Sequence, residues 1–113
     1  NHTVAIWEDA KFRGVDFRAV GNEPGWSLEI IKSEKIVFFG NYGQERFEFI
    51  ATDPSVDQKT RTTVYSAQTE EHEIAVRIVG RSCRDTMSGE AFETTVTVIL
   101  DAKKYHGCGK ALH

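Results

Sequence analysis

The chain lacks a basic cluster and a long apolar run. Lysine and arginine total 14 of 113 residues and the acidic residues total 17, giving a formal net charge of −3. Because phosphate contacts need clustered cations, the scattered basic residues argue against nucleic acid as a partner. No stretch approaches the roughly 18 apolar residues of a membrane span, so we expect no span in this chain. The composition, 40% hydrophobic and 27% charged, is that of an ordinary globular domain.

Motifs for catalysis and metal binding are also missing. No two of the four histidines have an H-x-x-x-H spacing, and His106-x-Cys108 is disabled as a soft metal site if Cys108 is bridged. Ser88 lacks the context of a nucleophile elbow. We therefore predict a protein that is not an enzyme and needs neither a cofactor nor a metal.

Cysteine is scarce, and its two occurrences are informative. Cys83 and Cys108 are the only cysteines, and an even pair in a small domain predicts a disulfide and an oxidising compartment. No Cys-x-x-Cys spacing exists, so we expect a structural bridge, which stabilises by roughly 3–4 kcal/mol in the chain-entropy model. We predict a periplasmic or secreted protein. The start at Asn1, without methionine or signal peptide, suggests processing from a precursor, with a lipid anchor there as one option.

Hydrophobic periodicity predicts one helix followed by strands. Val4, Trp7 and Ala10 fall at helical spacing over about residues 3–13, and Gly14 stands where a glycine ends a helix. From about residue 15 to residue 108 the period is two. The alternation predicts strands near residues 15–19, 26–30, 35–40, 46–51, 61–67, 73–79, 92–100 and 104–108.

With no repeat or βαβ unit, these strands predict one all-β domain over residues 1–113. We expect an antiparallel up-and-down barrel or a strongly curled sheet of about eight strands, with the short N-terminal helix covering one end or edge. A β-sandwich is the alternative. Strict alternation of strand direction places Cys83 and Cys108 at the same end of the sheet. The same argument places the turn at 21–25 and the loop at 83–90 at opposite ends, so that no single site uses both.

The turn Gly21-Asn22-Glu23-Pro24-Gly25-Trp26 is the first candidate site. Pro24 fixes its own φ and keeps Glu23 extended, while Asn22 can bond its own backbone to hold the turn. Trp26 opens an inward-facing strand, so we expect its ring to plug one end of the barrel and its N–H to find an acceptor. The residues Asn22, Glu23, Pro24 and Trp26 form either a structural turn or a ligand site.

The segment from Cys83 to Glu90 is the second candidate site. Asp85, Ser88 and Gly89 have turn chemistry, and Met87 can pack beneath a disulfide. Asp85 and Glu90, with the neighbouring hydroxyls, can instead form a polar knob that contacts a protein partner. The two interpretations, a structural loop and a binding loop, both stay open.

Both segments carry a resemblance to known proteins. The run from Asp16 to Trp26, the segment Cys83-Arg84-Asp85-Thr86-Met87-Ser88-Gly89 and the terminal Gly107-Cys108-Gly109 resemble a family of small bacterial envelope proteins. Many members are lipoproteins, and they are described only as uncharacterised. The resemblance spans roughly residues 7–109, and G-N-E-P-x-W with C-x-D-x-M-S is its specific combination. It implies an exported, periplasmic setting and brings no established catalytic residues. A bulkier aromatic often stands in the family where this chain has Gly25.

Three functional hypotheses follow. The first is a binding module in the periplasm or outside the cell that contacts another protein or the cell-wall surface through the loops at one end. The second, a narrower version of the first, is an inhibitor of lysozyme, by analogy with small disulfide-bonded barrels that insert a loop containing Ser and Gly into the enzyme cleft. The third is a carrier of a small apolar ligand inside the barrel. Its cavity would be lined by aromatic rings, namely Phe17, Trp26, Phe38, Phe47, Phe49 and Phe92.

Overall fold

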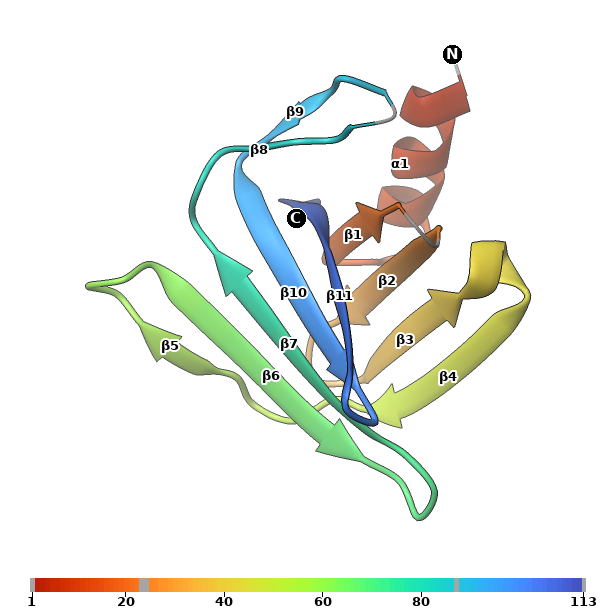
Figure 1. Cartoon of the computed structure of the whole chain (residues 1–113), viewed down its shortest axis with the longest axis vertical. Helices are drawn as coiled ribbons and strands as arrows, with labels where there is room; N and C mark the ends of the chain where they lie inside the picture. Colours follow the sequence, from red (N-terminus) through yellow and green to blue (C-terminus); the bar gives the residue numbers. More distant parts are fainter. Residues whose placement is uncertain (1, 23–24, 87, 113) are drawn as a thin grey trace.

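The computed structural model describes residues 2–22, 25–86 and 88–112, in which a helix lies against a strongly curled antiparallel sheet (Figure 1). In chain order the elements are α1 (His2–Phe12), β1 (Phe17–Gly21), β2 (Trp26–Ile31), β3 (Lys35–Gly40), the 3-10 turn η1 (Asn41–Gly43), β4 (Glu45–Ile50), β5 (Ser55–Asp57), β6 (Thr62–Gln68), β7 (Glu73–Val79), β8 (Cys83–Arg84), β9 (Ala91–Phe92), β10 (Thr94–Leu100) and β11 (Lys103–Ala111). Within the described ranges, no helix has the length and apolarity needed to cross a membrane.

The helix ends where the sequence predicts. Gly14 has φ +90°, the left-handed conformation that glycine adopts without strain. Its N–H donates to the carbonyl of Lys11, and the N–H of Val15 donates to the carbonyl of Ala10, the paired bonds of a Schellman motif. The helix covers the outer face of the sheet rather than an end of it. Its buried residues Trp7 and Ala10 pack there in one apolar cluster with Val15, Phe92, Cys108 and Leu112.

The curled all-β sheet is confirmed. Nine strands follow the order β4-β3-β2-β1-β11-β10-β7-β6-β5, every neighbouring pair antiparallel, and β8 pairs with β9 in a separate small hairpin. The eight expected strands are all present, and the ninth, β5, lies in a segment predicted to be a loop. The structure is therefore one curled sheet and not two packed sheets.

The sheet does not close into a complete barrel. The end strands β4 and β5 have a backbone neighbour on one side only. Side chains connect the open seam between β4 and β6: the Thr52 hydroxyl donates to the carbonyl of Ser66, and the Phe47 ring meets His72 edge to face, 4.9 Å between centroids. The fold is a half-barrel whose open seam is bridged by side-chain contacts.

Aromatic and branched side chains fill the concave side of the sheet. Phe38 lies 5.7 Å from Trp26, 6.3 Å from Phe47 and 4.9 Å from Tyr105 between ring centroids, so the rings expected to line a ligand cavity pack on one another. Phe92 is an exception, because it lies in β9 and packs against Trp7 on the outer face, 5.5 Å between centroids. The prediction that Phe92 begins the inward-facing strand is wrong.

The strands are strongly staggered, and this overturns the predicted separation of the two loops. Cys108 in β11 is level with Val20 near the end of β1 and also with Thr95 near the start of β10. Because of this shear, the turn that follows β1 lies beside the loop that precedes β10. Counting strand directions gives the relative orientation of strands but not their offset along the sheet. The described residues of the turn at 21–25 and of the loop at 83–90 are therefore neighbours.

Candidate functional site

The loop from Cys83 to Phe92 is a hairpin held by its own backbone. Cys83 is opposite Phe92 and Arg84 is opposite Ala91 in the β8–β9 pair. Inside the loop, the N–H of Asp85 donates to the carbonyl of Glu90 (2.9 Å), and the guanidinium of Arg84 donates to the carbonyl of residue 89 (2.7 Å). These bonds give the loop a defined shape despite its polar sequence.

Two polar side chains complete the turn. The Asp85 carboxylate accepts the N–H of Ser88 at 2.8 Å, and the Ser88 hydroxyl accepts the N–H of Glu90 at 3.1 Å. Gly89 has φ +74°, which explains glycine at that position. Ser88 and Gly89 are exposed, whereas Asp85 and Glu90 are half-buried. The predicted loop residue Met87 lies outside the described residues.

The predicted disulfide is present and anchors this hairpin. Cys83 and Cys108 are bonded, with 5.5 Å between their Cα atoms. The bond joins β8 to β11, the strand that pairs with both β1 and β10. The small hairpin is therefore fastened to the middle of the sheet. The bond itself indicates an oxidising compartment, which is compatible with a secreted or envelope protein.

Asn22 joins the two candidate sites. Its side-chain amide donates to the Asp85 carboxylate at 2.8 Å and to the Thr86 hydroxyl at 3.3 Å. The Asp85 carboxylate thus accepts one hydrogen bond from a distant turn and another from its own loop. Glu23 and Pro24, the other polar and rigid residues predicted for the turn, lie outside the described residues. The described parts of both motifs form one surface.

Trp26 lies behind this surface, and its ring leaves no room for a side chain at Gly21 or Gly107. Its side chain is buried, and its indole N–H donates to the carbonyl of His106 at 3.3 Å, as expected for a buried ring that plugs one end of the sheet. Gly21 and Gly107 face each other across β1 and β11. A Cβ atom at Gly21 would lie 2.0 Å from the indole nitrogen, and one at Gly107 would lie 2.0 Å from the carbonyl oxygen of Val20. No larger residue fits at either position without displacing its neighbours.

Gly25 lies directly against the η1 turn. A Cβ atom there would lie 2.6 Å from the Tyr42 ring, and the N–H of Tyr42 donates to the Gly25 carbonyl at 2.8 Å. The ring of Tyr42, which belongs to η1, therefore occupies the space that a side chain at residue 25 would need.

Arg18 and Trp7 extend the site, although neither was predicted to be a site residue. The Arg18 guanidinium lies 4.6 Å from the centre of the Trp7 ring. Together with Asn22, Ser88 and Glu90 they line a small pocket of about 180 Å³. Burial lowers the pKa of Arg18, against the opposing charge of a neighbouring carboxylate. Arg18 alternates with inward-facing residues, so the sequence pattern indicated only a solvent-facing side chain.

Arg18 keeps its hydrogen-bonding capacity because its cross-strand neighbour is engaged elsewhere. Glu29 is opposite Arg18 in the β1–β2 pair, but its two oxygens accept from Arg13 at 2.8 and 3.2 Å. Among the residues that the structure describes, none accepts a hydrogen bond from the Arg18 guanidinium. A half-buried guanidinium stacked on an aromatic ring is well placed to receive a carboxylate or a carbonyl oxygen.

A second groove flanks the other side of the hairpin. It has a volume of about 410 Å³ and is lined by the disulfide, Asn22, Arg84, Thr86 and His106. The hairpin is thus a ridge between two concavities. A ridge with an exposed Ser-Gly tip and a groove on either side suits contact with a larger molecule.

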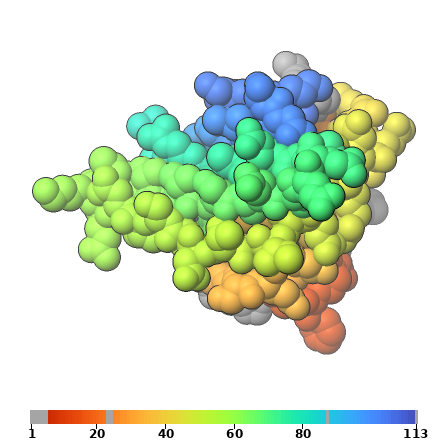
Figure 2. Space-filling view, turned by 90° about the horizontal axis from the view of Figure 1, so that it is seen from below, coloured from red at the N-terminus to blue at the C-terminus, as the bar shows by residue number. Residues whose placement is uncertain are grey.

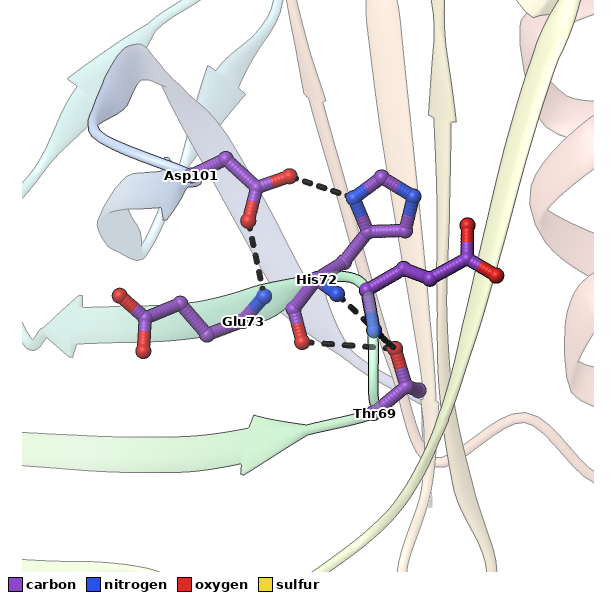
Figure 3. Close-up of polar contacts among 5 residues, drawn as sticks. Thr69, His72, Glu73 and Asp101 are labelled. Carbon is purple, nitrogen blue, oxygen red and sulfur yellow. Dashed lines mark hydrogen bonds and ion pairs between the residues drawn. The ribbon is translucent and has the colours of Figure 1, made fainter.

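His72 and Asp101 form a separate polar cluster between two turns (Figure 3), at the opposite end of the sheet from the β8–β9 hairpin (Figure 1). The His72 Nδ1 atom lies 2.6 Å from a carboxylate oxygen of Asp101, whose other oxygen accepts the N–H of Glu73 at 2.9 Å. The Thr69 hydroxyl accepts the backbone N–H groups of Glu71 and His72. This cluster joins the β6–β7 turn to the β10–β11 turn. In the described ranges, no group of three or more His, Cys, Asp or Glu side chains is arranged to hold a metal ion.

Comparison with protein-family models, curated protein sequences and solved structures gave no significant match for this chain.

Proposed function

We propose that this protein is a non-enzymatic binding module of the bacterial envelope, and that it binds a protein partner through the ridge 83–92 and the adjoining turn at Asn22. The observation that carries the proposal is the Asn22–Asp85 hydrogen bond, which unites two distinctive motifs in one surface. The resemblance of those motifs to exported envelope proteins supports the setting. The loop makes a suitable binding element because its internal bonds reduce the entropy that would be lost on binding.

The chemistry of the surface defines what it can contact. Its exposed tip, Ser88-Gly89, presents little side-chain bulk, so a partner backbone can approach closely. Glu90 supplies a half-buried negative charge beside the tip. Arg18 supplies hydrogen-bond donors in the adjacent pocket. A partner that offers a peptide backbone with charged side chains meets all three features.

Lysozyme inhibition is the narrower form of the same proposal. The exposed Ser-Gly tip on a disulfide-anchored hairpin supports it, since a ridge of this kind can enter an enzyme cleft. The net charge of −3 favours encounter with a basic enzyme. This version depends on analogy of fold and loop.

The experiment compares the wild type with Ser88→Trp in two assays. In the first, isotope-labelled protein is titrated with soluble envelope proteins and, separately, with purified cell-wall fragments, and amide shifts are mapped. In the second, inhibition of a basic lysozyme is measured. Ser66→Trp is the matched control, because Ser66 is also an exposed serine but lies on β6.

The proposal predicts shifts at residues 18–22 and 83–92 with protein, and at least a tenfold loss of affinity in Ser88→Trp with less than twofold change in Ser66→Trp. Shifts confined to other strands would refute the surface. Shifts with cell-wall fragments alone would replace the protein partner by a glycan. Absence of lysozyme inhibition by the wild type would remove the narrower version and leave the general one.

A further inference from the structure

The pocket that contains Arg18 is small and lies at the foot of the ridge 83–92. It has a volume of about 180 Å³ and is formed by α1, the end of β1 and the β8–β9 hairpin, which lie at the upper end of the molecule in Figure 1. Figure 2 shows the opposite end, where the turn after β2, in orange, lies beside the segment after β4, in yellow-green. Sites for drug-sized ligands have roughly 300–1,000 Å³. A pocket this small suits a single side chain of a partner.

Two groups of opposite charge line this pocket without being paired. Arg18 and Glu90 are both half-buried. In the described part of the chain, the Arg18 guanidinium has no hydrogen-bond acceptor, and the Glu90 carboxylate has neither a hydrogen bond nor an ion pair. No buried side-chain nitrogen or oxygen of the described residues lacks a partner. The unpaired polar atoms of Arg18 and Glu90 are therefore open to solvent, and a ligand can reach both.

Both residues are held in position by their neighbours. The Arg18 guanidinium lies 4.6 Å from the centre of the Trp7 ring, a stacking contact that leaves the N–H groups at its edge available. The backbone of Glu90 is fixed on both sides, since its N–H donates to the Ser88 hydroxyl and its carbonyl accepts the N–H of Asp85. The positions of both residues are thus defined before a ligand binds, which reduces the entropy lost on binding.

The charges in the pocket limit which side chain it can receive. A carboxylate can pair with Arg18, but it would share a small space with the carboxylates of Glu90 and Asp85, and like charges side by side are costly. A cationic group can pair with Glu90, but it would add a second positive charge beside Arg18 and leave that guanidinium without an acceptor. An apolar side chain would remove water from both charged groups and give neither of them a partner.

A primary carboxamide avoids all three costs. It is neutral, its carbonyl oxygen accepts hydrogen bonds from a guanidinium, and its NH₂ group donates to a carboxylate. Its short apolar stem can rest on Val20 and Phe92, which also line the pocket. We infer that this pocket receives an asparagine or glutamine side chain of the partner, with the carboxamide oxygen on Arg18 and the carboxamide nitrogen on Glu90. The inference rests on the proposed function, because it names the group that a partner bound to the ridge would place in the pocket.

The test titrates isotope-labelled protein with four probes that share one main chain, the N-acetyl methylamides of glutamine, glutamate, lysine and norleucine. Binding is followed through the indole N–H of Trp7 and the backbone amides of Arg18 and Glu90. We expect the glutamine probe to bind saturably with a dissociation constant of roughly 1–10 mM, as suits so small a ligand. The other three probes should bind at least about threefold more weakly, because each leaves a charged group unpaired or meets a like charge.

Glu90→Gln should change this order of affinities. It removes one of the negative charges that disfavour an acid and leaves Arg18 as the binding group, so the glutamate probe should gain at least about threefold relative to the glutamine probe. Glu93→Gln is the matched control, because Glu93 is an exposed glutamate that does not line the pocket. It should leave the order of the four probes as in the wild type.

The inference is overturned by equal affinities of the four probes for the wild type, by shifts confined to residues outside the pocket, or by no saturable binding up to the solubility limit of the glutamine probe. An unchanged ratio in Glu90→Gln also overturns it. The small probes need no partner protein, so the two proposals can fail separately. Shifts of the ridge by a protein, with failure of the glutamine probe, would leave the proposed function intact. Binding of the glutamine probe, with no protein that shifts the ridge, would remove the proposed function and leave the specificity of the pocket standing.

Discussion

Replacing Trp26 tests whether its ring is a structural part of the core. The side chain is 4% exposed, stacks on Phe38 and covers the paired glycines of β1 and β11. Trp26→Ala therefore removes a whole buried ring and leaves a cavity bounded by backbone that cannot easily move inward. Substitutions of this kind cost about 3–5 kcal/mol of the free energy of unfolding. The lost indole bond to His106 is included in that range, because such a bond contributes only about 1 kcal/mol.

The measurement is urea-induced unfolding of the oxidised protein followed by far-UV circular dichroism. Trp26→Phe is the graded control: it keeps an aromatic ring against Phe38 but loses the N–H and part of the volume, so its cost should fall between wild type and Trp26→Ala. A loss of less than about 1 kcal/mol in Trp26→Ala would refute the reasoning. It would mean that Trp26 is not part of the core and that the glycines serve another purpose.

Three further predictions concern the connections between loops. Reduction of the disulfide should lower the melting temperature by at least several degrees in a calorimetric scan, and free thiols in unreduced protein would contradict the assignment. Asn22→Ala should cost about 1 kcal/mol and speed amide exchange in the loop around Asp85, whereas unchanged exchange would show that the two loops are independent. The backbone N–H of Glu73, and then His72, lower the pKa of Asp101. Asp101 therefore stabilises the fold above its unfolded pKa near 4, and this contribution is lost as the pH falls through the lower folded value. Asp101→Asn should flatten the acid limb of a stability–pH curve, and an unchanged limb would contradict the assignment.

The strands could be predicted because alternation is a local property. In β2, every second residue is apolar and buried, as Leu28 is. In β7, the alternating residues Ile74 and Val76 are buried and Ile78 is partly buried. β5 escaped prediction because its three residues, Ser55–Asp57, are all exposed and follow a proline, so no alternation marks them. Alternation of apolar and polar residues reveals a strand because one of its faces is buried. β5 buries neither face, so its sequence shows no alternation.

The site was predictable only in parts. The residue types at Asn22 and Asp85 indicated turns, and both are in turns. Their hydrogen bond across 63 residues depends on the offset between strands, which strand direction alone does not determine. Arg18 could not be distinguished from an ordinary surface cation, because its environment is created by Trp7 on a separate helix. These are properties of packing between elements and are absent from any single segment.

The side-chain seam between β4 and β6 has a consequence for how the molecule opens. The backbone ladder is a row with two ends rather than a closed ring, so spontaneous opening begins at the ends and proceeds inward. Amide protons of β4 and β5 should exchange with solvent first, and those of β1 and β11, which have strands on both sides and lie next to the disulfide, should exchange last. Partial opening at β4 also uncovers a strand edge that another copy could pair with. The charged side chains along that strand, Glu45, Arg46 and Glu48, oppose such pairing.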